Sequence, residues 1–161
     1  MNDALDISFV LNGAPHRQRV PVRRHLVDML RLDCGVTGPH LGCEHGVCGA
    51  CHVRVDGTVV RGCLMLAVQV DGTTVETIEG LTARGVCADL QDAFVRHNAL
   101  QCGFCTSGIL LAASEYLERD GRPAREAIRD MLSGNVCRCT GYQPIIDAVA
   151  EVALARAAGG S

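Results

Sequence analysis

Eight of the ten cysteines in this 161-residue chain form two groups of four, and the two groups have different spacings. Successive cysteines of the first group are separated by four, two and eleven residues; its members are Cys43, Cys48, Cys51 and Cys63. Those of the second group are separated by two, thirty-one and one residues; its members are Cys102, Cys105, Cys137 and Cys139. Four thiolates complete the ligand set of a zinc ion or an iron–sulfur cluster. The spacing therefore predicts two separate metal sites.

The first group is typical of a [2Fe–2S] cluster. The pattern C-x4-C-x2-C followed by a distant cysteine is the plant-type arrangement, whereas structural zinc usually takes two short C-x-x-C pairs. Gly42, Gly46 and Gly49 allow the loop to turn its backbone N–H groups towards an anionic cluster. A Rieske centre is excluded, because no cysteine is followed by a histidine three residues later. The histidines of this region are expected to be solvated and not to bind metal; they are His40, His45 and His52.

The spacing of the second group alone does not identify the metal that it binds. Residues 102–105 and 137–139 each precede a predicted helix, so two helix N-termini would face one site. Their free N–H groups and positive dipole ends favour a negatively charged cluster. Structural zinc and a redox-active thiol pair are the alternatives for this group. Cys34 and Cys87 belong to neither group and are expected to be small buried apolar residues.

The first half of the chain predicts a small mixed sheet over one helix. Apolar residues alternate over 5–11, and Asn12-Gly13 is a typical hairpin turn that leads to a second strand over 18–22. A helix is predicted over 25–32. Two further hairpins are predicted, with strands over 52–55, 58–61, 67–70 and 73–78.

After Gly80 the periodicity becomes helical. Helices are predicted over 88–97, 103–118, 122–132 and 143–157. The expected fold class is therefore α+β, with a β-rich domain over 1–80, a four-helix domain over 81–161 and a boundary near 78–86.

Composition narrows the class of protein. Apolar residues make up 48% of the chain and charged residues 20%, as is usual for soluble globular proteins. No apolar run approaches the roughly 20 residues of a membrane span, and a net charge of −3 does not favour nucleic-acid binding. The N-terminal residues show neither a secretory signal nor a twin arginine. A cytoplasmic location is expected, where the reducing environment disfavours disulfides.

Three motifs resemble those of the xanthine oxidase, or molybdenum hydroxylase, family. QCGFCTSG and GNVCRCTGYQPI resemble the second-cluster signature of that family, and GCEHGVCGAC resembles its first-cluster loop. The resemblance covers essentially the whole chain and implies a plant-type ferredoxin-like β-grasp domain followed by a four-helix bundle domain. The sequence departs from the family pattern at Ser107 and Ile109, where proline and methionine are frequent.

The resemblance also implies two [2Fe–2S] clusters and their ligands. Cys43, Cys48, Cys51 and Cys63 would hold the outer cluster, on the flavin side. Cys102, Cys105, Cys137 and Cys139 would hold the inner cluster, beside a molybdenum–pterin cofactor. Gln101, which opens the second motif, would contact the pterin, and so would Cys139.

The function that the resemblance implies is electron transfer. The chain resembles the separate small subunit that relays electrons between a large molybdenum–pterin subunit and an FAD subunit, in a heterotrimer or a dimer of heterotrimers. The sequence contains no nucleophile elbow, no P-loop and no dinucleotide-binding glycine motif, so no substrate chemistry is expected on this chain. The alternatives are a free-standing two-cluster ferredoxin that docks with several partners and a zinc-bound scaffold without a redox role.

Overall fold

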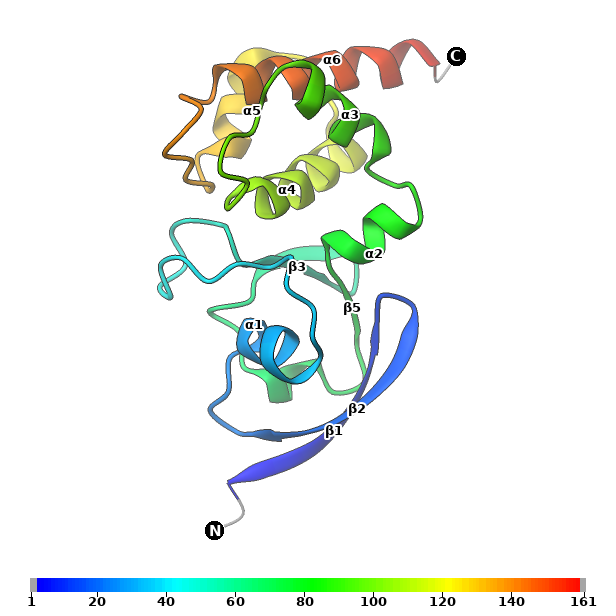
Figure 1. The fold of residues 1–161 in the computed structure, drawn as a ribbon. Coiled ribbons are helices and arrows are strands. Elements are labelled where there is room, and N and C mark those ends of the chain that lie inside the picture. The colour runs from blue at the N-terminus through cyan, green and yellow to red at the C-terminus, as the bar shows by residue number, and fades with distance from the viewer. Residues whose placement is uncertain (1–2, 160–161) are drawn as a thin grey trace.

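A computed structural model describes residues 3–159, which form a mixed α/β fold (Figure 1). Its sheet has five strands in the order β2-β1-β5-β3-β4, and only the β1–β5 pair is parallel. The strands are β1 (Ala4–Leu11), β2 (Ala14–Pro21), β3 (His52–Val55), β4 (Thr58–Arg61) and β5 (Thr74–Glu76). We call this sheet, together with α1, the sheet half of the molecule.

The first hairpin forms at the predicted turn, but β2 begins at Ala14, four residues before the predicted second strand. Ile7, Phe9 and Leu11 of β1 point into the core. Asn12 and Gly13 both have positive φ, 51° and 88°, as a two-residue hairpin turn requires.

One helical segment covers the sheet at the predicted position. It begins as α1 (Leu26–Asp28) and continues as a π-helical segment, η1 (Met29–Asp33). Leu26, Met29 and Leu30 are fully buried and share one hydrophobic cluster with the inward side chains of β1. This helix also leads the chain towards the loop that carries the first cysteine group (Figure 1).

The predicted hairpin over 67–78 is wrong. Residues Ala67–Val70 form a 3₁₀ helix, η2, in which Ala67 and Val70 are buried on one side. The Asp71 carboxylate accepts the N–H of Ser8 at 2.8 Å, and the N–H of Gly72 donates to the carbonyl of Ser8 at 2.8 Å, so this turn lies against β1. Strand β5 therefore pairs with β1 and β3 instead of with residues 67–70.

The second half of the chain is helical, as predicted. The helices are α2 (Ile78–Ala83), α3 (Ala88–Arg96), α4 (Thr106–Arg119), α5 (Arg125–Leu132) and α6 (Gln143–Gly159). Helix α2 occupies the predicted boundary region and lies between the sheet and the other helices (Figure 1). Helices α3–α6, which we call the helical half, share a hydrophobic cluster that is separate from the cluster of the sheet half.

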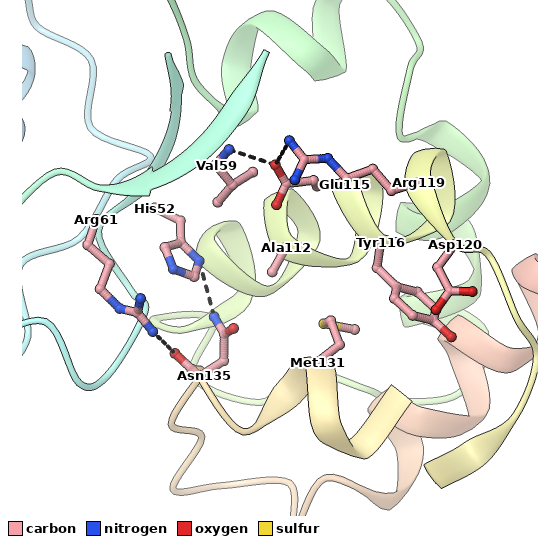
Figure 2. Close-up of a pocket in the computed structure, with 11 residues that line it drawn as sticks. His52, Val59, Arg61, Ala112, Glu115, Tyr116, Arg119, Asp120, Met131 and Asn135 are labelled. Atoms are coloured by element: carbon pink, nitrogen blue, oxygen red, sulfur yellow. Dashed lines mark hydrogen bonds and ion pairs between the residues drawn. The ribbon is translucent and has the colours of Figure 1, made fainter. Parts of the chain in front are cut away.

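Helix α4 covers the outer edge of the sheet. The Glu115 carboxylate accepts the N–H of Val59 in edge strand β4 at 2.8 Å, and Arg119 pairs with Glu115 at 3.0 Å (Figure 2). This covering satisfies an edge N–H group that would otherwise be open to another strand. In the adjacent strand, the largely buried Arg54 forms an ion pair with Glu118 of α4 at 3.0 Å.

We expect Glu118→Gln to lower the free energy of unfolding by about 1 to 2 kcal/mol. The variant leaves the Arg54 guanidinium, whose side chain is 8% exposed, without its countercharge. The partial exposure of Glu118 limits the loss. Urea unfolding followed by circular dichroism measures it, and Glu126→Gln on the exposed side of α5 is the control. Equal stability of the two variants would show that the ion pair does not hold the halves together.

Candidate metal centres

The first cysteine group lies in a loop whose backbone N–H groups donate to a cysteine sulfur. The N–H groups of Val47 and Cys48 each donate to Cys43 Sγ at 3.4 Å. Backbone N–H groups, that of Cys48 foremost, lower the pKa of Cys43 to about 6. Gly46 and Gly49 have positive φ, which permits the turns of this loop. The loop therefore stabilises negative charge on sulfur.

The other two thiols of the first group are buried and adjacent. Cys51 begins the approach to β3, and Cys63 follows β4. Burial, together with the neighbouring Cys63 thiol, raises the pKa of Cys51 to about 12. Thiols of this kind become thiolates when a metal cation replaces their protons.

The second group also consists of two thiol pairs. The Sγ atoms of Cys102 and Cys139 are 3.5 Å apart, and both residues are exposed. Cys105 and Cys137 also interact with each other, and burial is the main reason why the pKa of Cys105 is raised to about 12. The N–H of Phe104 lowers the pKa of Cys102. The structure thus brings together all four cysteines of the second group.

The helix ends contribute unequally to the second site. Cys105 is the N-cap residue of α4, so this helix starts at the site itself. Helix α6 starts four residues after Cys139, and the intervening loop is held by Tyr142. The Tyr142 hydroxyl accepts the N–H of Cys137 at 2.9 Å and donates to the carbonyl of Asn135 at 3.2 Å. Tyr142 is a supporting residue that the sequence reasoning did not identify.

The arrangement of the thiols fits two-iron clusters. Within residues 3–159, no three His, Cys, Asp or Glu side chains are grouped to hold a metal ion. The thiols instead lie in pairs, and a [2Fe–2S] cluster divides four thiolates between two irons. The four pairs are Cys43 with Cys48, Cys51 with Cys63, Cys102 with Cys139, and Cys105 with Cys137.

The two sites are joined by direct contacts between their loops. The N–H of Val136 donates to the carbonyl of Cys48 at 2.9 Å, so one hydrogen bond links a first-group cysteine to the neighbour of Cys137. Gly108 packs against the carbonyl oxygen of Gly49: a Cβ on Gly108 would lie 2.1 Å from that atom. The close approach of the two loops therefore depends on glycine at position 108.

Gln101 lies beside the second site. Its side-chain Nε2 donates to the carbonyl oxygen of Cys139 at 3.1 Å, and both residues are exposed. The structure therefore places side by side, on the surface, the two residues for which the resemblance implies pterin contact.

The histidines near the first group differ from the prediction of a solvated set. His52 lies in β3, is only 6% exposed and has Nδ1 3.2 Å from the carbonyl oxygen of Gly108. Burial lowers its pKa. His40 is half-buried, and only His45 is exposed as expected. Sequence reasoning missed His52 because the atoms that bury it belong to α4, 56 residues further along the chain.

A pocket lies where β3 and β4 face α4 and α5 (Figure 2). Some of its polar groups contact one another: His52 lies 3.5 Å from the Asn135 amide, and Arg61 donates through a terminal guanidinium nitrogen to the carbonyl of Gly134 at 3.3 Å, while Arg61 Nε is buried without a hydrogen-bond partner in the described part of the chain. His52, Val59 and Arg61 of the sheet half therefore contact the helical half across this pocket (Figure 2).

Of the two cysteines outside both groups, which the sequence predicts to be buried, one is fully so. Cys87 is fully buried at the start of α3, and burial raises its pKa. Cys34 is half-buried against the core of the sheet half, and burial raises its pKa as well.

Two family models match the chain. A "2Fe-2S iron-sulfur cluster binding domain" matches residues 9–82, and a "[2Fe-2S] binding domain" matches residues 77–150. Each match includes one of the two cysteine groups. No helix within residues 3–159 has the length and apolar character needed to cross a membrane.

Curated relatives and solved structures match the chain over almost its full length. The nicotine 6-hydroxylase small subunit of Paenarthrobacter nicotinovorans is 50% identical over 150 residues, which cover 93% of this chain and 90% of the relative. The caffeine dehydrogenase subunit gamma of Pseudomonas sp. (strain CBB1) is 46% identical over 149 residues, covering 91% and 89%.

A crystal structure of quinoline 2-oxidoreductase from Pseudomonas putida 86 superposes with a TM-score of 0.88 at 46% identity, covering 99% of this chain and 98% of the matched chain. Aldehyde oxidoreductase from Desulfovibrio gigas superposes with a TM-score of 0.86 at 39% identity, over 96% of this chain but only 17% of that longer one. The chain therefore belongs to the small iron–sulfur subunits of the molybdenum hydroxylases, the family of xanthine oxidase, and is an electron-transfer component of an oxidoreductase.

Proposed function

We propose that Cys43, Cys48, Cys51 and Cys63 hold the outer [2Fe–2S] cluster, and that Cys102, Cys105, Cys137 and Cys139 hold the inner one. The observation that carries this assignment is the pairing of the thiols at two neighbouring sites, each with backbone N–H groups aimed at sulfur. When bound, each cluster accepts and releases one electron.

Residues of this chain offset the charge of the two sites, shield one of them from water and connect the two. The N–H groups on Cys43 and Cys102 offset the negative charge of a thiolate-bound cluster. Burial of Cys51 and Cys63 keeps water from one side of the outer site. The Val136–Cys48 hydrogen bond links the two loops directly.

We propose further that the partners are a large molybdenum–pterin subunit and an FAD subunit, in a cytoplasmic heterotrimer or dimer of heterotrimers. Gln101 and Cys139 are exposed and adjacent, and so are accessible to a cofactor held by another chain. Leu100, Phe104 and Val136 are exposed apolar residues within two positions of a second-group cysteine. Exposed apolar side chains in the segments that carry the second group are typical of a contact surface, which favours an obligate subunit over a free ferredoxin.

We also propose a division into a β-grasp domain over 1–80 and a four-helix bundle domain over 81–161. The two separate hydrophobic clusters and the two successive family matches support this division. The boundary falls within α2, which packs on both β5 and α4.

Metal analysis of the purified chain tests the assignment. We expect about four irons and about four sulfides per chain, with two distinct signals in electron paramagnetic resonance after reduction. Zinc without visible absorbance would refute it.

Purification of the tagged chain from its own organism tests the partner proposal. We expect two larger chains to remain bound through gel filtration, one carrying molybdenum and one FAD. The complex is then assayed with nicotine, caffeine and an aldehyde, the compounds named for relatives. Recovery of the chain alone, with full iron, would favour the free ferredoxin.

A further inference from the structure

Three side chains outside the thiol pairs connect the two cysteine loops, and we call His40, Phe104 and Ser107 the inter-loop clamp. Ser107 lies in the first turn of α4 and is 9% exposed. Its hydroxyl donates to the carbonyl of Gly38 at 2.6 Å and lies 3.5 Å from His40 Nδ1. Proline, which is frequent at this position in the family, fits the first turn of a helix but has no hydroxyl group. The departure at position 107 therefore adds a contact between the halves.

Residues 38–40, which Ser107 contacts, also form hydrogen bonds with η1, with α2 and with the loop of the first group. The N–H of Gly38 donates to Glu79 Oε1 at 2.6 Å, and Arg31 donates to the carbonyl of Pro39 at 2.8 Å. The N–H of His40 donates to the carbonyl of Ala50 at 2.9 Å, one residue before Cys51. His40 is thus anchored to the loop of the first group.

The His40 ring stacks on Phe104, which lies between Cys102 and Cys105 in the sequence. The ring centroids are 4.6 Å apart and the planes differ by 27°. Phe104 is 46% exposed, so its ring is not held by burial in a core. The stack on His40 is thus a contact of the ring outside any hydrophobic core.

Phe104 is close to sulfur atoms of both groups. Its backbone N–H faces the Cys102 thiol of the second group. Its ring atom Cε1 lies 3.4 Å from the point where a Cβ on Gly42 would stand, and that point is 3.1 Å from Cys48 Sγ of the first group. One residue thus lies next to ligand candidates of both sites.

We propose that the inter-loop clamp sets the separation of the two clusters, with His40, Phe104 and Ser107 as positioning residues for electron exchange between them. The inference rests on the proposed ligand assignment. The Phe104 ring keeps the two loops apart at a fixed distance, and Ser107 holds His40 where it can stack. Because electron exchange falls steeply with distance, a small shift of either loop changes its rate.

The test uses the full chain with both clusters loaded. The magnetic interaction between the two reduced clusters is measured by electron paramagnetic resonance, and the rate of electron exchange is measured after pulsed reduction. We expect Phe104→Ala and His40→Ala to change the magnetic splitting and to slow exchange several-fold, with a smaller effect in the same direction for Ser107→Ala. His40→Phe preserves the stack but loses the contact with the Ser107 hydroxyl, so we expect at most the small effect of Ser107→Ala. Val95→Ala, which removes an exposed apolar side chain from α3, is the control.

The possible outcomes separate the two proposals. Unchanged splitting and rate in both Phe104→Ala and His40→Ala, with both signals present, would overturn the clamp and leave the ligand assignment intact. Loss of iron in Phe104→Ala while His40→Phe keeps full iron would also overturn it, because the ring would then retain the cluster instead of setting a distance. Absence of two cluster signals in the parent chain would overturn the proposed function itself.

Discussion

Replacement of Cys51 by serine is expected to remove one cluster and to leave the other in place. Iron should fall from about four to about two per chain, because each cluster contains two irons and needs four soft thiolate ligands. Cys51 is 2% exposed and lies beside Cys63 in a small buried cluster. A hydroxyl group at this position supplies no comparable ligand, and among residues 3–159 no cysteine other than Cys51 and Cys63 lies in that cluster.

The reciprocal variant makes the experiment decisive. Cys105→Ser should also leave about two irons per chain, but it should abolish the other of the two paramagnetic signals. Cys34→Ser is the matched control, because Cys34 lies outside both groups and is half-buried. We expect that control to keep full iron and both signals. Loss of all iron in Cys51→Ser, or an identical missing signal in the two variants, would contradict the assignment of two independent sites.

Gly108→Ala is expected to separate the two cysteine loops and to destabilise the whole chain. The new Cβ would lie 2.1 Å from the carbonyl oxygen of Gly49 and 3.1 Å from Ala50 Cα, and backbone atoms cannot rotate away. An alanine inside a helix ordinarily gains about 1 kcal/mol over glycine. Overpacking of this severity outweighs that gain, and we expect a net loss of about 2 kcal/mol or more.

The displacement of Gly49 in the Gly108→Ala variant also affects the two metal sites. Movement of Gly49 draws Cys48 away from Val136 and breaks the hydrogen bond that links the two loops. We therefore expect faster loss of iron from the first site than from the second when the variant is warmed. Urea unfolding by circular dichroism measures stability, since the chain has no tryptophan to report by fluorescence. Gly159→Ala, where a Cβ would meet nothing within 4 Å, is the control. A Gly108→Ala variant as stable as that control would show that the loops are not in contact.

Local patterns predicted most of the elements. The Asn12-Gly13 hairpin and the helices α3–α6 follow from turn residues and apolar periodicity, which act between neighbours in the chain. Two helices begin three residues later than predicted, because residues 103–105 and 122–124 form the loops that precede them. The strand predicted over 67–70 failed because a short apolar run does not distinguish a strand from a 3₁₀ turn.

The partners of β5 could not be predicted in the same way. Residues Thr74–Glu76 pair with β1, more than sixty positions earlier, and with β3. Nothing in the local sequence separates this pairing from a hairpin around Asp71-Gly72, since both place a turn there. In the folded chain Asp71, Gly72 and Thr73 all form hydrogen bonds with residues of β1, and these contacts exist only once β1 lies beside them.

The sequence by itself determined that there are two groups of four thiols, that one lies in a glycine-rich loop after the first helix, and that the other precedes helices. Spacing along the chain is sufficient for this, because ligand sets and helix starts are local features. Only the tertiary structure decided that the two loops touch, that His52 is buried between the halves, and that His40 stacks on Phe104. These contacts join residues more than fifty positions apart, so they depend on how the helical half packs against the sheet half, which no local pattern encodes.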